Sequence, residues 1–254
     1  MSADEIANIL KDIKEQGFPL EVRTSEILEA HDWEIRNQFG YLDHEEKKPK
    51  TVDILAKKNI LHDVNRLVLD VHLIIECKRS TKPWVFYASD FDLNKQGISL
   101  RAVAASQFFI DPLAFKKRVH ENFDEIMSSF LLKIHLKSPI FEKWAHIPFE
   151  PFSGGQVRDI HKARMQVCNT ILDLMRGRFD IQQLTSPYGT ILMPIIVFDG
   201  HLYTYRDEKL NAEKGLYYFF SYANSSFMIE VVTKDFFDEY LDIVDGQIKH
   251  LQTI

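Results

Sequence analysis

The chain has 254 residues, 45% of them hydrophobic and 12% aromatic, which is enough for a substantial core and excludes an intrinsically disordered protein. The net charge of −6 excludes a global basic field, so any surface for phosphate groups must be local or helped by cations. Two cysteines, Cys77 and Cys168, exclude a disulfide framework. Since no run approaches the about 20 apolar residues of a membrane span and the N-terminus lacks a signal-peptide pattern, we expect a cytoplasmic protein without a membrane partner.

The first third of the chain is expected to form two helices and then three strands. Apolar spacing predicts the helices over residues 3–15 and 20–30. Runs of apolar and β-branched residues predict strands over residues 33–41, 51–58 and 67–78. The charged segment 43–50 is typical of a turn between the first two strands.

The middle of the chain, residues 85–155, is rich in aromatic residues and shows no clear period. We interpret it as an insertion packed on the core, with helices near 101–108 and 111–129. Exposed aromatic rings could stack on bases, but rings at this density favour core packing.

The remaining pattern predicts a helix, four strands and a last helix. The helices are expected over residues 156–176 and 234–251. Strands are expected over residues 190–200, 201–205, 217–222 and 227–232, and Asp199-Gly200 indicates a hairpin between the first two. The order predicts an α/β fold, a mixed central sheet flanked by helices, in a single domain over residues 1–254.

The segment IIECKRSTKPW, residues 74–84, carries the first candidate site residues. Because successive side chains of a strand face opposite ways, Glu76 and Lys78 share one face and Cys77 takes the other. A carboxylate and an amine at the end of a buried strand are costly without partners or a function. We therefore take Glu76 and Lys78 as half of a site.

The preceding strand offers Asp53, an acid between the aliphatic residues Val52 and Ile54, which should both face away from it. Asp53 and Glu76 on neighbouring strands would repel each other, and a divalent cation relieves that repulsion. Oxygen ligands suit Mg²⁺ or Mn²⁺, and the backbone carbonyl of Cys77 could be a further ligand. Alternatively, Asp53, Glu76 and Lys78 form a structural network of ion pairs.

An acid in a strand, followed by a strand that ends in Glu76-Cys77-Lys78, resembles the PD-(D/E)xK nuclease superfamily, which has the restriction-endonuclease-like fold. The IECK sequence resembles that of the Mrr-like restriction enzymes and the archaeal Holliday junction resolvases. The family core consists of a helix, three strands, a helix and a strand. The resemblance places this core at residues 18–84 and 156–200, an insertion at 85–155 and a C-terminal elaboration at 201–254.

The resemblance also implies further site residues. The family usually adds a Glu on the first core helix, which here is Glu21 or, alternatively, Glu26. A Gln or a basic residue on the later helix can face the site and contact substrate, and Gln156 and Lys162 could serve. The sequence departs from the family name because Val52, and not Pro, precedes Asp53.

By this resemblance the protein is expected to be an endonuclease that depends on Mg²⁺ or Mn²⁺ and acts in restriction, phage defence or repair. DNA is a more natural partner than RNA, although no base-reading motif separates the two. A homodimer is plausible because cleavage of two strands commonly requires two active sites. The alternatives are an RNA nuclease and a module that binds nucleic acid or another partner without cutting, which the acidic net charge favours.

Overall fold

The fold was analysed in a computed structural model of the chain. It describes residues 5–9, 13, 18–43, 45–62, 67–90, 108–110, 140–141, 143–151, 157–177, 188–223 and 225–252. The helices with defined bounds are α2 (Phe18–Ala30), α7 (Arg158–Gly177) and α8 (Phe237–Gln252). The strands are β1 (Glu34–Leu42), β2 (Pro49–His62), β3 (Leu67–Arg79), β4 (Trp84–Asp90), β5 (Phe108–Ile110), β6 (Lys143–Phe149), β7 (Tyr188–Asp199), β8 (Leu202–Arg206), β9 (Lys209–Ala212), β10 (Gly215–Tyr222) and β11 (Ser225–Thr233).

In the described part of the chain the strands form one 11-stranded mixed sheet. Its order is β1-β2-β3-β7-β11-β10-β6-β4-β8-β9, and β5 pairs with β7 beside this path. Strands β1, β2 and β3 are antiparallel neighbours, whereas β3, β7 and β11 run parallel. The prediction of an α/β protein with a mixed sheet is thereby confirmed.

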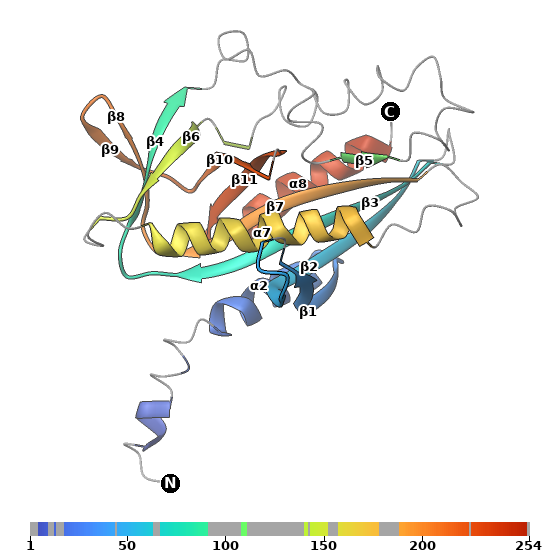
Figure 1. The fold of residues 1–254 in the computed structure, drawn as a ribbon, viewed down its shortest axis with the longest axis horizontal. Helices are drawn as coiled ribbons and strands as arrows, with labels where there is room; N and C mark the ends of the chain where they lie inside the picture. The colour runs from blue at the N-terminus through green and yellow to red at the C-terminus, as the bar shows by residue number, and fades with distance from the viewer. Residues whose placement is uncertain are drawn as a thin grey trace.

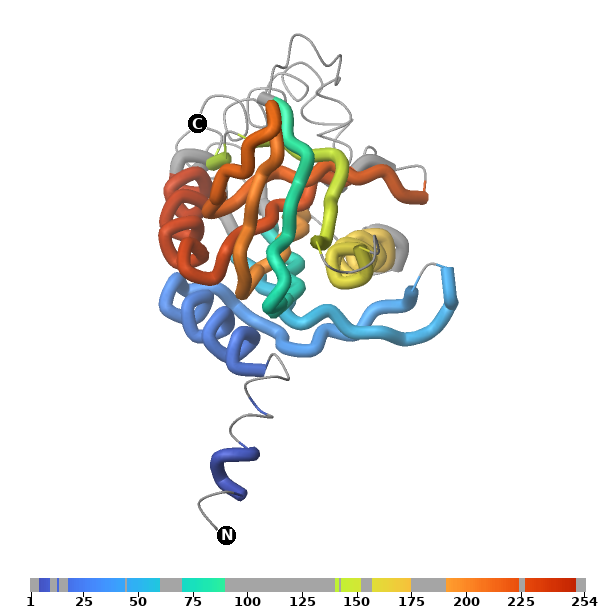
Figure 2. The backbone as a smooth tube through the Cα atoms, turned by 90° about the vertical axis from the view of Figure 1, so that its left-hand side faces the viewer, coloured from blue at the N-terminus to red at the C-terminus, as the bar shows by residue number. Residues whose placement is uncertain are grey.

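Helices cover both faces of the sheet, with α7 on one face and α2 and α8 on the other (Figures 1 and 2). The core beneath α7 contains Val167 and Ile171, which are fully buried. The opposite core contains Leu28 of α2 and Tyr240 of α8, also fully buried. The central strands are therefore apolar on both faces, which explains their near-continuous hydrophobic runs.

The long helix α7 begins where its first amide groups find a partner. Buried Glu150 accepts a hydrogen bond from the backbone amide of Ile160 at 2.8 Å. Asp159 lies in the first turn, where a negative charge is favourable to the helix dipole. The bond to Glu150 ties the first turn of α7 to the end of β6.

The predicted hairpin at Asp199-Gly200 is wrong, although both of its strands exist. Strand β7 already has β3 and β11 on its two edges, so β8 pairs with β4 instead. Gly200 is needed for a close approach, because a Cβ atom there would lie 2.7 Å from the carbonyl oxygen of Ser80. The glycine therefore marks a crossing of chain segments and not a two-residue turn.

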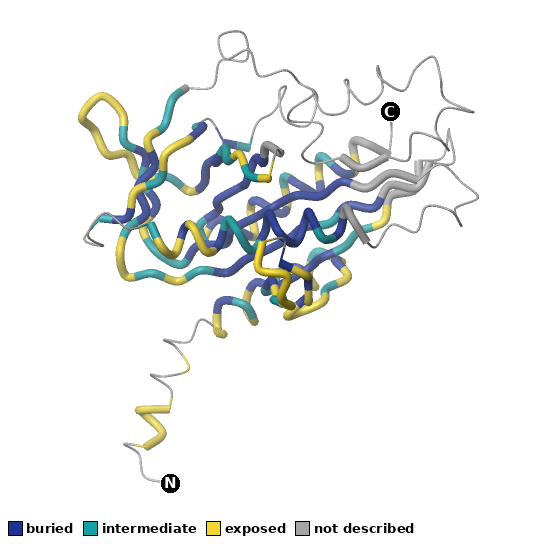
Figure 3. The backbone as a smooth tube through the Cα atoms, in the orientation of Figure 1, coloured by how far each residue is buried: buried dark blue, intermediate teal, exposed yellow. Residues whose placement is uncertain are grey.

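The segment 85–155 contributes β4 and β6 to the sheet, which its irregular pattern does not predict. The helices expected near 101–108 and 111–129 lie outside the described residues, except Phe108 in β5. The first expected helix, over 3–15, is described at residues 5–9 and 13, which are helical. Figure 3 shows buried central strands and an exposed end at β8 and β9. None of the described helices is long and apolar enough to cross a membrane.

Candidate active site

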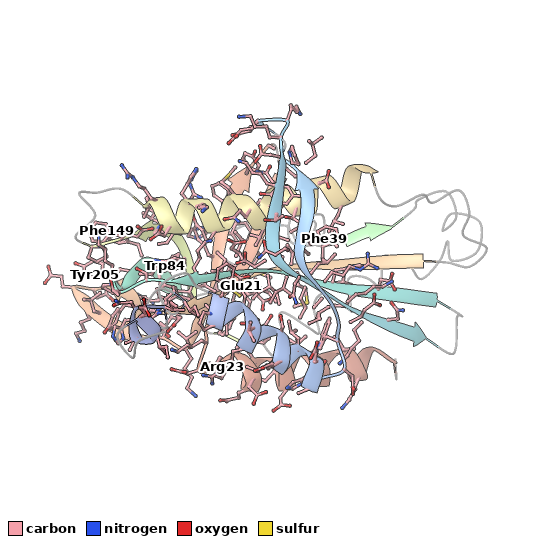
Figure 4. The ribbon with its side chains drawn as sticks, turned by 90° about the horizontal axis from the view of Figure 1, so that it is seen from below. Glu21, Arg23, Phe39, Trp84, Phe149 and Tyr205 are labelled. Carbon is pink, nitrogen blue, oxygen red and sulfur yellow. The ribbon has the colours of Figure 1, made fainter. Side chains whose placement is uncertain are left out.

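The candidate site lies where β2 and β3 stop pairing. The last pair in their register is Ile54 opposite Ile75, so Asp53 and Glu76 are the next residue on each strand. Beyond this point the β1–β2 hairpin turns away from β3 (Figure 4). Two carboxylates are thus placed at the fork between neighbouring strands.

In both strands of the hairpin, side chains two or four residues apart pack on opposite sides of the sheet across this fork. On β2, Val52 packs in the core beneath α7, whereas Ile54 packs in the opposite core. On β1, Ile35 and Phe39 are divided between the two cores in the same way. The expectation that Val52 and Ile54 share a face is therefore wrong. Gln38 lies at the crossover on β1 and has a φ of 50°, which interrupts the regular alternation.

Asp53 is fixed to the end of β3 by a backbone contact. The amide of Cys77 donates a hydrogen bond to Asp53 Oδ2 at 2.8 Å. Burial raises the pKa of the Asp53 carboxyl, and the Cys77 amide, Lys78 and Lys162 oppose this shift. The Cys77 side chain takes the other face, where its Sγ lies 3.7 Å from Thr24 Oγ1 of α2.

Glu76 is fully buried and has one satisfied carboxylate oxygen. Lys78 Nζ donates to Glu76 Oε1, so the two side chains share a face as the strand alternation predicts. Glu76 Oε2 is buried and has no hydrogen-bond partner among the described residues. Burial, followed by the charge of Asp53, raises the pKa of Glu76 to about 8 despite the nearby ammonium group.

Glu21, in the first turn of α2, reaches the same site (Figure 4). Its Oε2 accepts a hydrogen bond from Gln38 Nε2 at 2.8 Å. Burial and then the charge of Asp53 raise the pKa of Glu21, while Gln38 and Lys78 lower it. Glu26 is exposed on the same helix and makes none of these contacts. Of the two helix acids, Glu21 is the one coupled to Asp53 and Lys78.

Gln38 is a site residue that the sequence does not reveal. Besides its bond to Glu21, its Oε1 accepts a hydrogen bond from Thr51 Oγ1 at 3.3 Å, and its side chain lowers the pKa of Asp53. A positive φ costs a non-glycine residue energy, so the chain holds Gln38 here against a local preference. A lone glutamine in a strand gives no signal of this role.

The structure describes one of the two residues that were expected to face the site from the later helix. Gln156 lies outside the described residues. Lys162 is exposed on α7, and its charge lowers the pKa of Asp53. Lys162 also lines a pocket of about 480 Å³ between α7 and the β1–β2 hairpin. The lysine therefore lies beside the site on the α7 face.

The donor set at the fork suits a divalent cation. Among the described residues no three His, Cys, Asp or Glu side chains gather closely enough to enclose an ion. A cation would instead bind Asp53 and Glu76 and take further ligands from the Cys77 carbonyl and water. The unpartnered Glu76 Oε2 fits this set, because a buried carboxylate oxygen without a partner is costly unless a ligand satisfies it.

The comparisons with known proteins give no match for this chain. No protein-family model matches it, and no curated protein or solved structure matches it with significance. The site must therefore be interpreted from its own geometry.

Proposed function

We propose that the protein is a metal-dependent nuclease that hydrolyses phosphodiester bonds, with DNA as its substrate. The observation that carries the proposal is the arrangement at the fork. A buried glutamate has one oxygen without a partner among the described residues, a lysine binds its other oxygen, and the next amide along the strand anchors an aspartate. Such a cluster has a cost to the fold and is typical of functional sites.

The order of elements supports the same conclusion. The described core runs α2, β1, β2, β3, α7 and β7, with β3 and β7 parallel and helices on both faces. This is the order of the PD-(D/E)xK core that the sequence resembles, and we propose that the chain adopts that restriction-endonuclease-like fold. Strands β4, β6 and β8–β11 would then be additions to one edge of the core sheet.

In the proposed mechanism each residue has a separate task. Asp53 and Glu76 would hold Mg²⁺ or Mn²⁺, and the ion would supply Lewis-acid activation of the phosphodiester and of the attacking water. Lys78 would orient the attacking water and stabilise negative charge on the phosphate. Glu21 would accept a proton or a hydrogen bond from a water at the α2 side of the fork. Gln38 positions Glu21.

A non-cleaving module that binds nucleic acid is the second candidate, and the net charge of −6 favours it. In that case the contact between Lys78 and Glu76 would be a structural ion pair. The two candidates differ in one respect that can be measured, which is whether a phosphodiester bond is broken.

The test is a cleavage assay in Mg²⁺, Mn²⁺ or EDTA on linear, supercoiled, single-stranded and branched DNA, with RNA in parallel. We expect cleavage of at least one DNA substrate in metal, none in EDTA, and none by Glu76→Gln. A matched control is Lys57→Ala, which removes the ion pair between Lys57 Nζ and Asp70 Oδ2 (2.8 Å) on the same two strands. No cleavage of any substrate in either metal, or equal cleavage by Glu76→Gln, would contradict the proposal.

A further inference from the structure

The sheet ends in an exposed edge strand, β9. In the described part of the chain β9 pairs with β8 alone and is the last strand in the sheet order. All of its residues are exposed, and Leu210 is 59% exposed (Figure 3). An open edge presents backbone N–H and C=O groups that can pair with a strand of another chain.

The edge at the other end of the sheet, β1, is less suited to such pairing. The positive φ of Gln38 interrupts the regular alternation of β1. The register of β9 with β8 is continuous over all 4 residues of β9. Asp207 and Glu208 join the two strands with φ values of 49° and 61°, which are typical of a tight type I′ turn. The edge at β9 is therefore regular, whereas the edge at β1 is interrupted.

The hydrogen bonds of this hairpin decide which backbone groups of β9 point outward. The amide of Glu213 donates to the carbonyl oxygen of Leu202 at 2.9 Å, so Glu213 directs its backbone groups toward β8. Because these directions alternate along an antiparallel pair, Leu210 and Ala212 direct theirs outward. A further strand can therefore bond to β9 only through Leu210 and Ala212.

We propose that β9 pairs with β9 of a second copy of this chain, antiparallel and with the twofold axis at Asn211. Leu210 then lies opposite Ala212 of the partner subunit, and the two residues exchange N–H···O bonds in both directions. In the same register Lys209 lies opposite the partner's Glu213. Because the axis is twofold, each contact forms twice and the interface is isologous.

Charge favours a copy of this chain as the occupant of the edge. Lys209 lies opposite Arg206 within its own hairpin, and like charges at opposite positions destabilise a strand pair. The carboxylate of the partner's Glu213 would offset this repulsion. Glu213 accepts a hydrogen bond from the hydroxyl of Thr204 at 2.6 Å, which holds its side chain against the hairpin. By strand alternation Glu213 and Lys209 lie on the same face of the hairpin.

Charge also selects the register. Because only outward-facing residues can pair, one strand can shift against the other only in steps of two residues. A shift by one step places Lys209 opposite the partner's Asn211 or opposite the partner's Gly215, and neither residue is charged. The register centred on Asn211 therefore has the better electrostatic match.

The other face of the hairpin carries apolar residues that this pairing extends. Directly opposite residues on β6, β4, β8 and β9 form one row, which consists of Ile147, Tyr87, Tyr205 and Leu210. The rings of Tyr87 and Tyr205 are in contact, with their centroids 5.2 Å apart. In the pair of copies the row continues from Leu210 to the partner's Ala212 and then to the partner's Tyr203. Removal of Leu210 from water would add a hydrophobic contribution to the interface.

The test is the oligomeric state of the full chain, measured by sedimentation equilibrium. A range of about 1–100 µM is suitable, because an interface of one short strand should be weak. We expect a reversible dimer of the wild type. Lys209→Glu and Glu213→Lys should each raise its dissociation constant by about 10- to 100-fold, because like charges replace opposite charges at both contacts. Lys209→Glu also places a carboxylate opposite Arg206, which favours the hairpin, so loss of the dimer would not reflect unfolding of β9.

A mixture of the two variants tests the twofold pairing. In a heterodimer of Lys209→Glu with Glu213→Lys, opposite charges face each other at both contacts, so the mixture should dimerise as tightly as the wild type. The matched control is Arg36→Glu, the same charge reversal at an exposed residue of the edge strand β1. This control should leave the dissociation constant unchanged.

Engineered cysteines test the register. Asn211→Cys should form an intersubunit disulfide on oxidation, because opposite residues without hydrogen bonds between them have Cα atoms about 4.5 Å apart. Leu210→Cys should crosslink much more slowly. The natural Cys77 and Cys168 are both buried and should not interfere.

The inference goes beyond the proposed nuclease function and does not depend on it, since no residue of the fork takes part in the interface. A wild-type protein that stays monomeric over the whole range would overturn it. A dimer that both charge variants leave unchanged, or variants that do not recover in the mixture, would also overturn it. Faster crosslinking by Leu210→Cys than by Asn211→Cys would contradict the register.

Discussion

Two glutamates in different parts of the sheet, Glu76 on β3 and Glu230 on β11, are both buried. Both are 0% exposed, and each has one hydrogen-bonded oxygen and one oxygen without a partner among the described residues. Burial raises the pKa of each, to about 8 for Glu76 and to about 7 for Glu230. By burial and pKa alone, the two residues are nearly equivalent.

Their surroundings differ. Glu230 has paired strands on both sides, with Ile195 of β7 and Tyr217 of β10 as neighbours, and its Oε2 accepts a hydrogen bond from Tyr240 at 2.6 Å. Glu76 has β7 on one side only, since β2 has parted from β3. Its neighbours are charged, namely Asp53 and Lys78. A perturbed carboxyl group thus indicates a function when charged partners and an open strand edge accompany it.

The largest expected effect is that of Lys78→Ala. Because the lysine is not a metal ligand, this variant should bind Mn²⁺ nearly as wild type does. Its cleavage rate should fall by ~10²–10⁴, as for a positioned acid–base group. The change removes the ammonium group that binds Glu76, and Glu230 has no counterpart of it among its described contacts. If the Lys78→Ala protein melts at a lower temperature but cuts at the full rate, the contact between Lys78 and Glu76 is only a structural ion pair.

Glutamine substitutions should show that only one of the two glutamates is needed for cleavage. Both folded-state pKa values lie above the ordinary 4.5, so the stability that each group contributes is present below about pH 4.5 and is lost as the pH rises through the folded value. Glu230→Gln should therefore stabilise the protein above pH 8, by about 3 kcal/mol, with little change at pH 4 and no loss of cleavage. Glu76→Gln should also stabilise the protein above pH 8, but it should abolish cleavage.

Denaturant unfolding at pH 4 and pH 8.5, with a cleavage assay on the same preparations, measures both effects. A wild-type pH dependence of stability that Glu230→Gln leaves unchanged would contradict the buried-carboxyl explanation. Loss of cleavage in Glu230→Gln would contradict the assignment of function to the fork alone.

Tyr240→Phe should have a smaller effect, confined to stability. It removes the hydroxyl that donates to Glu230 and leaves a buried carboxyl group unpaired, at a cost of about 1–3 kcal/mol. The loss should be greater at pH 8.5 than at pH 4, because the ionised carboxylate depends more on the donor. Unfolding curves at the two values of pH give the difference, and a loss that is the same at both would argue against an ionised Glu230.

The strands around the fork could be predicted because their patterns are local. The apolar run of β3 and the alternation through Glu76, Cys77 and Lys78 require only the geometry of a strand. The acid Asp53 is conspicuous between aliphatic neighbours. Glu21 could be proposed from the resemblance, but its contact with Gln38 and its electrostatic coupling to Asp53 and Lys78, which distinguish it from Glu26, are visible only in the structure.

The features that could not be predicted depend on strand partners distant in sequence. Asp199-Gly200 has the composition of a hairpin turn, but pairing of β8 depends on which edges of β7 are free. Gln38 becomes a site residue only because β1 pairs with β2. The face change between Val52 and Ile54 likewise appears only in the packing, where the two residues belong to opposite cores.

The most direct test of the account is a calorimetric titration of Mn²⁺ into the wild-type protein and Asp53→Ala. Asp53→Asn is a second variant, because its amide oxygen can still accept the hydrogen bond from the Cys77 amide. Glu230→Gln serves as the control for a buried carboxyl group away from the fork. We expect Mn²⁺ to bind wild type and Glu230→Gln alike, and to bind both Asp53 variants far more weakly. Equal binding by wild type and the folded Asp53 variants would show that the fork is not a metal site.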